Sequence, residues 1–300
     1  MRLLSRTLLT LTSVLAAGLA VTACTTPSHA QTPAAAARAQ APVPVTKLLV
    51  FVEENHSLDH MRSGMPYTAG LAEQYGYATD YHAIRHPSLP NYIAVAAGQT
   101  LDVHDDALPA RHRLTGRSVF GQALRHGRTA ATYAESMPSA CVRTNKGAYA
   151  ARHNPWTYFT GEHTGCAAHD LGLRALATAA RTGRLPNVGL VVPNLDHDAH
   201  DGTLATADAW FRTQMQKVFA GPDWKSGRLA VVLTADEDDH TQGNKVLTVV
   251  IHPSQVHHVV GTRLTHYSLT RLYDEVAHLP YLANAATAPS MAEAFGLPLS

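Results

Sequence analysis

Three polar clusters in the sequence carry the residue types that metal-assisted hydrolysis needs. Glu54 and Asn55 follow an apolar run, Ser88 stands between two prolines, and the acidic run Asp236–Asp239 follows another apolar run. Carboxylate and amide oxygens are hard ligands that suit Mg, Ca or Mn. A serine at a helix start is well placed to act as a nucleophile beside such a cation. Together the clusters predict a metal-dependent hydrolase.

Each cluster also has a simpler interpretation. Glu54 and Asn55 would serve equally as a cap for the next helix, and Ser88 as an ordinary N-cap. Pro90 fits the first turn of the helix after Ser88, because its missing N–H costs nothing there. The acidic run needs a cation only if it is buried at a strand end, where mutual repulsion must be offset. A calcium-binding helix–loop–helix is disfavoured, because Thr241 stands where that loop needs glycine.

Two further segments supply imidazole, carboxylate and guanidinium groups. Asp198 and His200 suit metal binding or proton transfer to a leaving group, with a plain polar loop as the alternative. Arg152 and His153 are candidate phosphate ligands, since arginine binds phosphate in a bidentate manner; a surface loop is the alternative. His266 opens the last predicted helix, where it would otherwise serve as a cap.

Short apolar runs alternate with amphipathic segments along the chain. The predicted strands are 45–52, 77–84, 129–133, 187–192, 229–233 and 246–251. The predicted helices are 65–75, 91–97, 118–125, 171–182, 203–219 and 266–277. This alternation predicts an α/β fold, a three-layer α/β/α sandwich with a mostly parallel sheet. Ligands bind such sheets at the carboxyl ends of the strands, where Glu54, Asn194–Asp201 and Asp236–His240 fall.

The N-terminus has the composition of a targeting segment. Residues 1–24 combine a basic start with an apolar stretch, and end in Val-Thr-Ala-Cys, which resembles a bacterial lipobox. Cys24 is therefore the predicted lipidation site; cleavage near Ala30 with ordinary secretion is the alternative. Residues 25–44 are rich in Ala and Pro and predict a flexible tether. One catalytic domain is predicted over 45–300, outside the cytoplasm and held at the membrane by the lipid anchor.

Composition narrows the remaining possibilities. The formal net charge of +1 does not fit a nucleic-acid-binding protein. No Gly-x-Ser-x-Gly elbow and no phosphate-cradling Gly-rich loop occur in the sequence. Cys141 and Cys166 are the cysteines left after Cys24, and in an oxidising compartment they most simply form a disulfide.

In sequence order, these clusters resemble the bacterial phosphoesterase family of acid phosphatases and phospholipases C, within the alkaline-phosphatase-like superfamily. The resemblance extends from about Lys47 to about Leu297. It rests on six segments: Val52–Ser57, His86–Tyr92, Tyr149–Pro155, Asp198–Gly202, Asp236–Asp239 and His266–Leu269. Sulfatase relatives have a different motif at the nucleophile, with arginine where this chain has Tyr92.

The resemblance implies roles for the site residues. The divalent metal, whose identity among Mg, Ca, Mn, Fe and Zn stays open, would be held by Glu54, Asn55, Asp236 and Glu237. The catalytic groups would be Ser88 as nucleophile, with Asp198 and His200. The substrate-binding groups would be Asn91, Arg152, His153 and His266.

The predicted function is therefore that of a metal-dependent, acid-phosphatase-like phosphoesterase acting on small phosphate esters. A phosphodiesterase or phospholipase C is one alternative, although the chain is short beside the large phospholipases. A non-catalytic lipoprotein that binds a phosphorylated ligand is the other. The oligomeric state is not predicted.

Overall fold

The computed structural model describes residues 42–300, and Pro42–Ser300 form a compact unit. The predicted targeting segment 1–24, with Cys24, and nearly all of the tether 25–44 lie outside the described residues. Over residues 42–300, no helix has the length and apolar character needed to cross a membrane.

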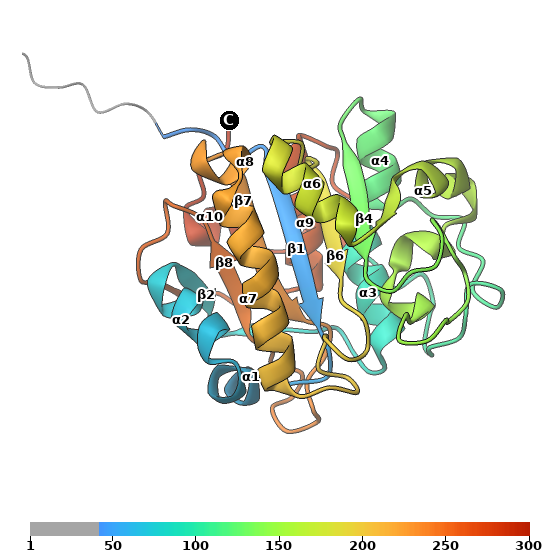
Figure 1. Cartoon of the computed structure of the whole chain (residues 1–300), viewed down its shortest axis with the longest axis horizontal. Helices are drawn as coiled ribbons and strands as arrows, with labels where there is room; N and C mark the ends of the chain where they lie inside the picture. The colour runs from blue at the N-terminus through green and yellow to red at the C-terminus, as the bar shows by residue number, and fades with distance from the viewer. Residues whose placement is uncertain (1–41) are drawn as a thin grey trace, which may run out of the picture. The chain divides into compact units, whose positions relative to one another are not determined.

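An eight-stranded sheet runs through the centre of this unit, in the order β5-β4-β6-β1-β7-β8-β2-β9 (Figure 1). Its strands are β1 (Lys47–Glu53), β2 (Gly76–Ala78), β4 (Ala130–Ala134), β5 (Asp170–Gly172), β6 (Val188–Val192), β7 (Leu229–Ala235), β8 (Thr248–Ile251) and β9 (His258–Val260). β8 runs antiparallel to β7 and β2, and every other neighbouring pair is parallel. A second, parallel pair consists of β3 (Tyr81–His82) and β10 (Leu264–Thr265). The predicted mostly parallel sheet is confirmed.

Helices cover both faces of the sheet, as the three-layer prediction requires (Figure 1). One face carries α1 (Leu58–Gly64), α2 (Pro66–Gln74), α6 (Arg174–Thr182), α7 (Leu204–Ala220) and α8 (Pro222–Lys225). The other carries α3 (Ser88–Ala97), α4 (Val119–Arg125), α9 (His266–Ala277) and α10 (Met291–Phe295), with α5 (His163–His169) beside α4. Short 3₁₀ turns are η1 (Ala151–His153), η2 (Pro155–Tyr158), η3 (Thr160–Glu162) and η4 (Ala283–Ala286).

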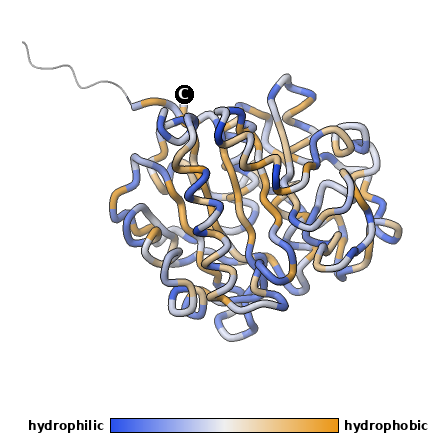
Figure 2. Tube along the Cα trace, in the orientation of Figure 1, coloured by the Kyte–Doolittle hydropathy of each residue, from blue (hydrophilic) through white to orange (hydrophobic). Residues whose placement is uncertain are grey.

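The apolar strands form the core between these helical layers. Six of the seven residues of β1 are buried, which is why the run has no polar alternation: both faces of this strand are covered. Figure 2 shows the same pattern as hydrophobic colour along the central strands. On the α7 side, the ring of Phe51 meets that of Phe211 edge to face, with 5.0 Å between the centroids.

Three predicted elements differ from those observed. The predicted strand 77–84 is two short strands, β2 and β3, that belong to different sheets. The predicted helix 171–182 begins only at Arg174, because residues 170–172 pair with β4 as the edge strand β5. The predicted helix 91–97 begins three residues earlier, at Ser88.

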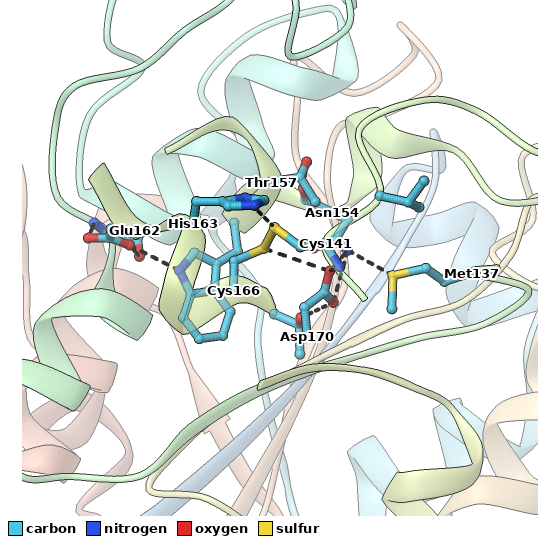
Figure 3. The surroundings of a disulfide bond; sticks show 12 residues. Met137, Cys141, Asn154, Thr157, Glu162, His163, Cys166 and Asp170 are labelled. Atoms are coloured by element: carbon cyan, nitrogen blue, oxygen red, sulfur yellow. Dashed lines mark hydrogen bonds between the residues drawn. A yellow bond between two sulfur atoms is a disulfide. The ribbon is translucent and has the colours of Figure 1, made fainter. Parts of the chain in front are cut away.

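The predicted disulfide between Cys141 and Cys166 is present, with 5.4 Å between the Cα atoms (Figure 3). It links the loop after β4 to α5. Buried Asp170 supports this loop by accepting hydrogen bonds from the Cys141 backbone N–H at 3.0 Å and from the Asn154 side chain. The disulfide therefore restrains the segment that leads to η1, where Arg152 and His153 lie.

Candidate active site

The site lies where β1, β6 and β7 end. β1 pairs with β6 on one side and with β7 on the other, so the loops after these strands meet at one edge of the sheet. Backbone hydrogen bonds join the loops: the N–H of Glu54 donates to the carbonyl of Asp198 at 2.7 Å. The N–H of Asp236 donates to the carbonyl of Glu53 at 3.0 Å. Carboxylates far apart in the sequence are thereby brought side by side.

Ser88 is the first residue of α3, and its hydroxyl points at this group of carboxylates. The Oγ atom donates a hydrogen bond to Oε2 of Glu54 at 3.0 Å, and the side chain is buried. Pro87 is the N-cap of α3, so Ser88 is not an N-cap, and the Asp106 carboxylate accepts the Leu89 N–H of the first turn at 2.9 Å. Glu54 and Asn55 do not cap the next helix either, since the N-cap of α1 is Ser57.

Glu54 is the centre of a buried hydrogen-bond network. Its Oε1 atom accepts a short hydrogen bond from the hydroxyl of Tyr92, and its Oε2 atom lies 3.3 Å from Nε2 of His153. The Nδ1 atom of His153 bonds to Oδ2 of Asp198 at 3.1 Å, and the Tyr92 ring stacks on the His153 ring. Burial lowers the pKa of His153 well below its usual value, which favours the neutral form of this imidazole.

Two oxygen atoms in the site are buried and accept no hydrogen bond: Oδ1 of Asn55 and Oδ2 of Asp236. The other Asp236 oxygen, Oδ1, accepts from the backbone N–H groups of Asn55 at 3.1 Å and Glu237 at 2.7 Å. Hard oxygens without hydrogen-bond donors suit a hard divalent cation. The residues present therefore fit the metal that the sequence predicts.

The charges in the site lead to the same conclusion. Burial, reinforced by the Asp236 charge, raises the pKa of Glu237 to about 9 and that of Glu54 well above its usual value. Burial likewise raises the pKa values of Asp236 and Asp198 to about 7. These carboxyls resist ionisation in the absence of a compensating positive charge.

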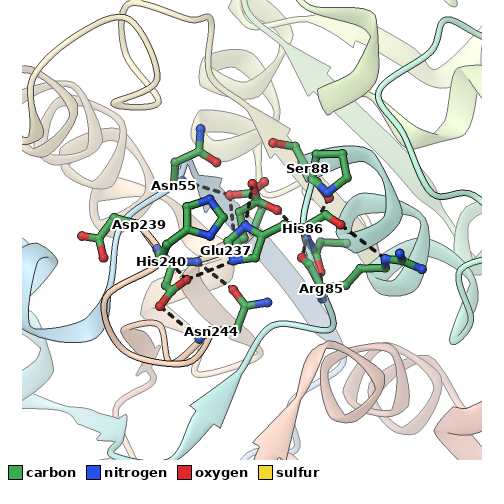
Figure 4. A network of polar contacts seen from close by, with 12 residues as sticks. Asn55, Arg85, His86, Ser88, Glu237, Asp239, His240 and Asn244 are labelled. Carbon is green, nitrogen blue, oxygen red and sulfur yellow. Dashed lines mark hydrogen bonds and ion pairs between the residues drawn. The ribbon is translucent and has the colours of Figure 1, made fainter.

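Glu237 is held from two sides. Its Oε2 atom accepts a hydrogen bond from Nδ2 of Asn91 at 3.1 Å, and its Oε1 atom lies 3.2 Å from Nδ1 of His86 (Figure 4). The Asn91 side chain is fully buried, and its Oδ1 accepts the backbone N–H of Ile84 at 3.0 Å. Asn91, a predicted substrate ligand, thus braces Glu237 and the turn before α3.

Arg152 and His200 lie together at the rim of the site. The Nη2 atom of Arg152 donates to Nε2 of His200 at 3.0 Å. Because a guanidinium only donates, the His200 Nε2 atom is an acceptor here, and Nδ1 bonds to Asp201 at 2.7 Å. His200 would have to leave Arg152 before it could protonate a leaving group.

His266 lies behind the site. It is fully buried, its Nε2 atom donates to the carbonyl of Asp236 at 2.7 Å, and its Nδ1 atom pairs with the hydroxyl of Tyr81 at 3.0 Å. Burial lowers its pKa to about 4. Thr265 caps α9, so His266 acts as a support for the Asp236 backbone.

Tyr92 and His86 are contacts of the site that the sequence interpretation did not select. Tyr92 follows Ser88 by four residues on α3, and residues at this spacing share a helix face. His86 precedes the proline before Ser88, and its Nε2 atom bonds to Oδ1 of Asp238 at 3.1 Å. The spacing of Ser88 and Tyr92 along the helix could have predicted that Tyr92 faces the site. No local sequence pattern predicts the contact of His86 with Asp238, because the two residues are far apart in the sequence.

Comparison with known proteins identifies the class to which this fold and site belong. The chain belongs to the Phosphoesterase family, whose family model matches residues 60–275. It is a phosphoric ester hydrolase of the α/β fold seen in the alkaline phosphatase superfamily. The family expected from the motifs is confirmed.

Two of the matched proteins are named as phosphatases. A phosphatidylinositol-3-phosphatase of Mycobacterium tuberculosis is 28% identical over 253 residues, covering 83% of this chain and 82% of that protein. A phosphate-repressible acid phosphatase of Penicillium chrysogenum is 27% identical over 216 residues, covering 66% of this chain and 51% of that protein. The chain thus spans about half of this fungal relative.

Solved structures show the same fold at low identity. A protein in the alkaline phosphatase superfamily from Vibrio parahaemolyticus superposes with a TM-score of 0.57 at 10% identity, covering 84% of this chain and 72% of that chain. The lipoteichoic acid synthase LtaP from Listeria monocytogenes gives a TM-score of 0.52 at 9% identity, covering 81% of this chain and 76% of that chain.

Proposed function

We propose that this chain is a metal-dependent phosphatase that uses Ser88 as its nucleophile and acts outside the cytoplasm. The observation that carries the proposal is the Ser88 hydroxyl, which is at the start of α3 and 3.0 Å from Glu54. The orphaned oxygens of Asn55 and Asp236 support a cation beside it. Glu54, Asn55, Asp236 and Glu237 would hold that cation.

The first step is attack of Oγ of Ser88 on phosphorus. The Oγ–P bond forms, the bond from phosphorus to the ester oxygen breaks, and the hydroxyl proton passes to the Glu54 oxygen that already accepts it. The backbone N–H of Ser88 and the dipole of α3 stabilise the phosphoryl charge, since the Leu89 N–H already donates to Asp106 and Pro90 has no N–H. A bound divalent cation would neutralise part of the negative charge that builds up on the phosphoryl oxygens.

The departing alkoxide takes a proton at the open side of the site, where His200 becomes available once Arg152 turns to the phosphate. Water then attacks the phosphoserine and gives a proton to the His200 imidazole, the P–Oγ bond breaks, and Oγ recovers its proton from Glu54. The Asp198 carboxylate fixes the orientation of His153, so that Nε2 faces the reacting groups. Substrate and water would both enter on the side of Arg152.

The names of the relatives support a monoester substrate. The mycobacterial and the fungal relatives are both named as phosphatases, so we propose phosphomonoesters as the substrates here. The disulfide supports action in an oxidising compartment. Lipidation at Cys24 remains part of this proposal.

A pair of serine variants tests the nucleophile. Ser88→Ala should lose at least about four orders of magnitude of hydrolysis of 4-nitrophenyl phosphate, because covalent catalysis is lost with it. Ser118→Ala is the matched control: Ser118 is also buried at a helix start, where its Oγ caps α4 by accepting the Gly121 N–H at 3.0 Å. The Ser118 hydroxyl also donates to buried Glu162, so this control should lose about 2–4 kcal/mol of stability and keep its activity.

Substrate and metal tests separate the alternatives. Faster turnover of a bis(4-nitrophenyl) phosphate diester than of the monoester would identify a phosphodiesterase instead. No turnover of either ester by the wild-type chain with Mg, Ca, Mn, Fe or Zn would favour the non-catalytic binding protein. Undiminished activity after metal removal and chelation would refute the metal requirement.

A further inference from the structure

Two histidines and a carboxylate form a separate cluster next to the active site, which we call the His–Asp cluster: His56, His60 and Asp239. His56 lies in the turn after β1, His60 lies in α1, and Asp239 lies in the loop after β7. One ligand-type atom from each residue lies within 4.8 Å of the others. The two imidazole centroids are 6.4 Å apart.

One buried nitrogen of the cluster has no hydrogen-bond partner. The Nδ1 atom of His56 is buried and has no hydrogen-bond partner, while Nδ1 of His60 contacts Oδ2 of Asp239. The other oxygen of Asp239, Oδ1, accepts from the backbone N–H of Thr241 at 3.2 Å. Oδ2 is therefore the oxygen that Asp239 presents to the two imidazoles.

The cluster also has an outer support of the kind that orients metal ligands. The hydroxyl of Ser57 donates to Oδ2 of Asp239 at 3.1 Å and fixes the carboxylate. The His60 side chain is 58% exposed, so solvent reaches the cluster and can complete a coordination shell.

We propose that the His–Asp cluster is a second cation site, specific for a borderline transition metal such as Zn²⁺. Two imidazole nitrogens and one carboxylate oxygen are a ligand set that zinc accepts, with water in the remaining position. The hard, oxygen-only group around Asn55 and Asp236 has a different preference. The chain therefore carries two neighbouring sites of different ligand chemistry.

A cation in the His–Asp cluster would connect two loops of the active site. His56 directly follows Asn55, and Asp239 lies on the same loop as Asp236 and Glu237, pointing away from His86 (Figure 4). Zinc bound there would fix the turn after β1 against the loop after β7. The second cation thus holds the two loops that supply the hard oxygen ligands at a fixed separation.

Zinc titration of the full-length chain tests this site. Calorimetry on metal-stripped protein is done in an Asp236→Asn background, which disables the oxygen-rich site. Adding His60→Gln or Asp239→Asn should weaken Zn²⁺ binding by more than about 100-fold. Losing a residue that only orients a metal ligand already costs up to about 100-fold in affinity, so losing a ligand should cost more. Co²⁺ in place of Zn²⁺ should give a visible absorption band that the same changes remove.

His126→Gln is the matched control, because His126 is an exposed histidine at the C-cap of α4 and belongs to none of the groups of metal-ligating side chains among residues 42–300. It should bind Zn²⁺ as tightly as the background. Unchanged zinc affinity in His60→Gln, or loss only in His126→Gln, would overturn the proposal. His60 is exposed, so thermal unfolding with chelator should confirm that its variant folds. A wild-type chain that binds this zinc yet hydrolyses no phosphate ester would refute only the proposed function.

Discussion

Replacing Asp236 with asparagine should raise the stability of the metal-free chain and abolish its activity. The amide is isosteric with the carboxylate, and its oxygen can still accept the N–H groups of Asn55 and Glu237 that now bond to Oδ1. The NH₂ group then occupies the position of the orphaned Oδ2 atom. A hydrogen-bond donor thus replaces an anionic oxygen at the cation site.

The size of the stability gain follows from the pKa of Asp236, which burial raises from 3.8 to about 7. A shift of about 3 units costs about 4 kcal/mol of folding free energy once the folded carboxyl ionises. Since the folded pKa is above the unfolded one, this cost is absent below about pH 4, grows from there to pH 7 and is complete above it. In the wild type, a metal at 100 times its Kd would restore about 3 kcal/mol.

Urea unfolding of wild type and Asp236→Asn in chelator, at pH 4 and pH 8, measures the effect. The variant should be more stable at pH 8 by up to about 4 kcal/mol, should match the wild type at pH 4, and should gain nothing from added Mn²⁺. Asp223→Asn is the control: Asp223 is a buried carboxylate that pairs with Lys47 at 2.6 Å, so this variant should lose stability and keep its activity. A destabilised, metal-responsive and active Asp236→Asn chain would refute the reasoning.

Three further changes have expected outcomes. Tyr92→Phe removes the hydroxyl that donates to Glu54, and kcat/KM should fall by about 10-fold or more, since a hydrogen bond to a charged group is worth about 1.5–3 kcal/mol; a change below twofold would contradict this. Changing both Cys141 and Cys166 to serine opens a loop with a sequence separation of 25 and should cost about 3.5 kcal/mol in urea unfolding; an unchanged midpoint would contradict the estimate. Arg152→Ala should raise KM by about 10-fold with a smaller change in kcat, and an unchanged KM would remove its role in phosphate binding.

The central sheet was predictable because its strands are long and buried on both faces. β1, β6 and β7 are apolar runs that cannot be solvent-facing strands or amphipathic helices. β9 and β10 have three and two residues, too few for any periodicity. The antiparallel direction of β8 was also missed, although residues 236–247 hold no helix that would return the chain for a parallel strand.

The site was predictable as far as strand ends determine it. Glu54, Asp198 and Asp236 follow strands that are neighbours in the sheet. The rule that ligands bind at the carboxyl ends of parallel strands therefore predicts that these residues lie close together. The contact of His153 with Glu54 depends on a 3₁₀ turn inside the loop that the Cys141–Cys166 disulfide closes, and no local pattern encodes that position. The burial of His266 was also not predictable: its imidazole donates to the Asp236 carbonyl beneath the loop, and its place at a helix start does not indicate that contact.

The order of strands in the sheet constrains how the chain folds during synthesis. β1 leaves the ribosome first, yet its two partners, β6 and β7, begin at residues 188 and 229. Until then the nascent protein exposes an apolar strand with both edges unpaired, a state that invites aggregation. Recombinant yield should therefore respond to chaperone supply and slow translation. A truncated product that ends before Asp236 should have neither the complete sheet nor its chemistry.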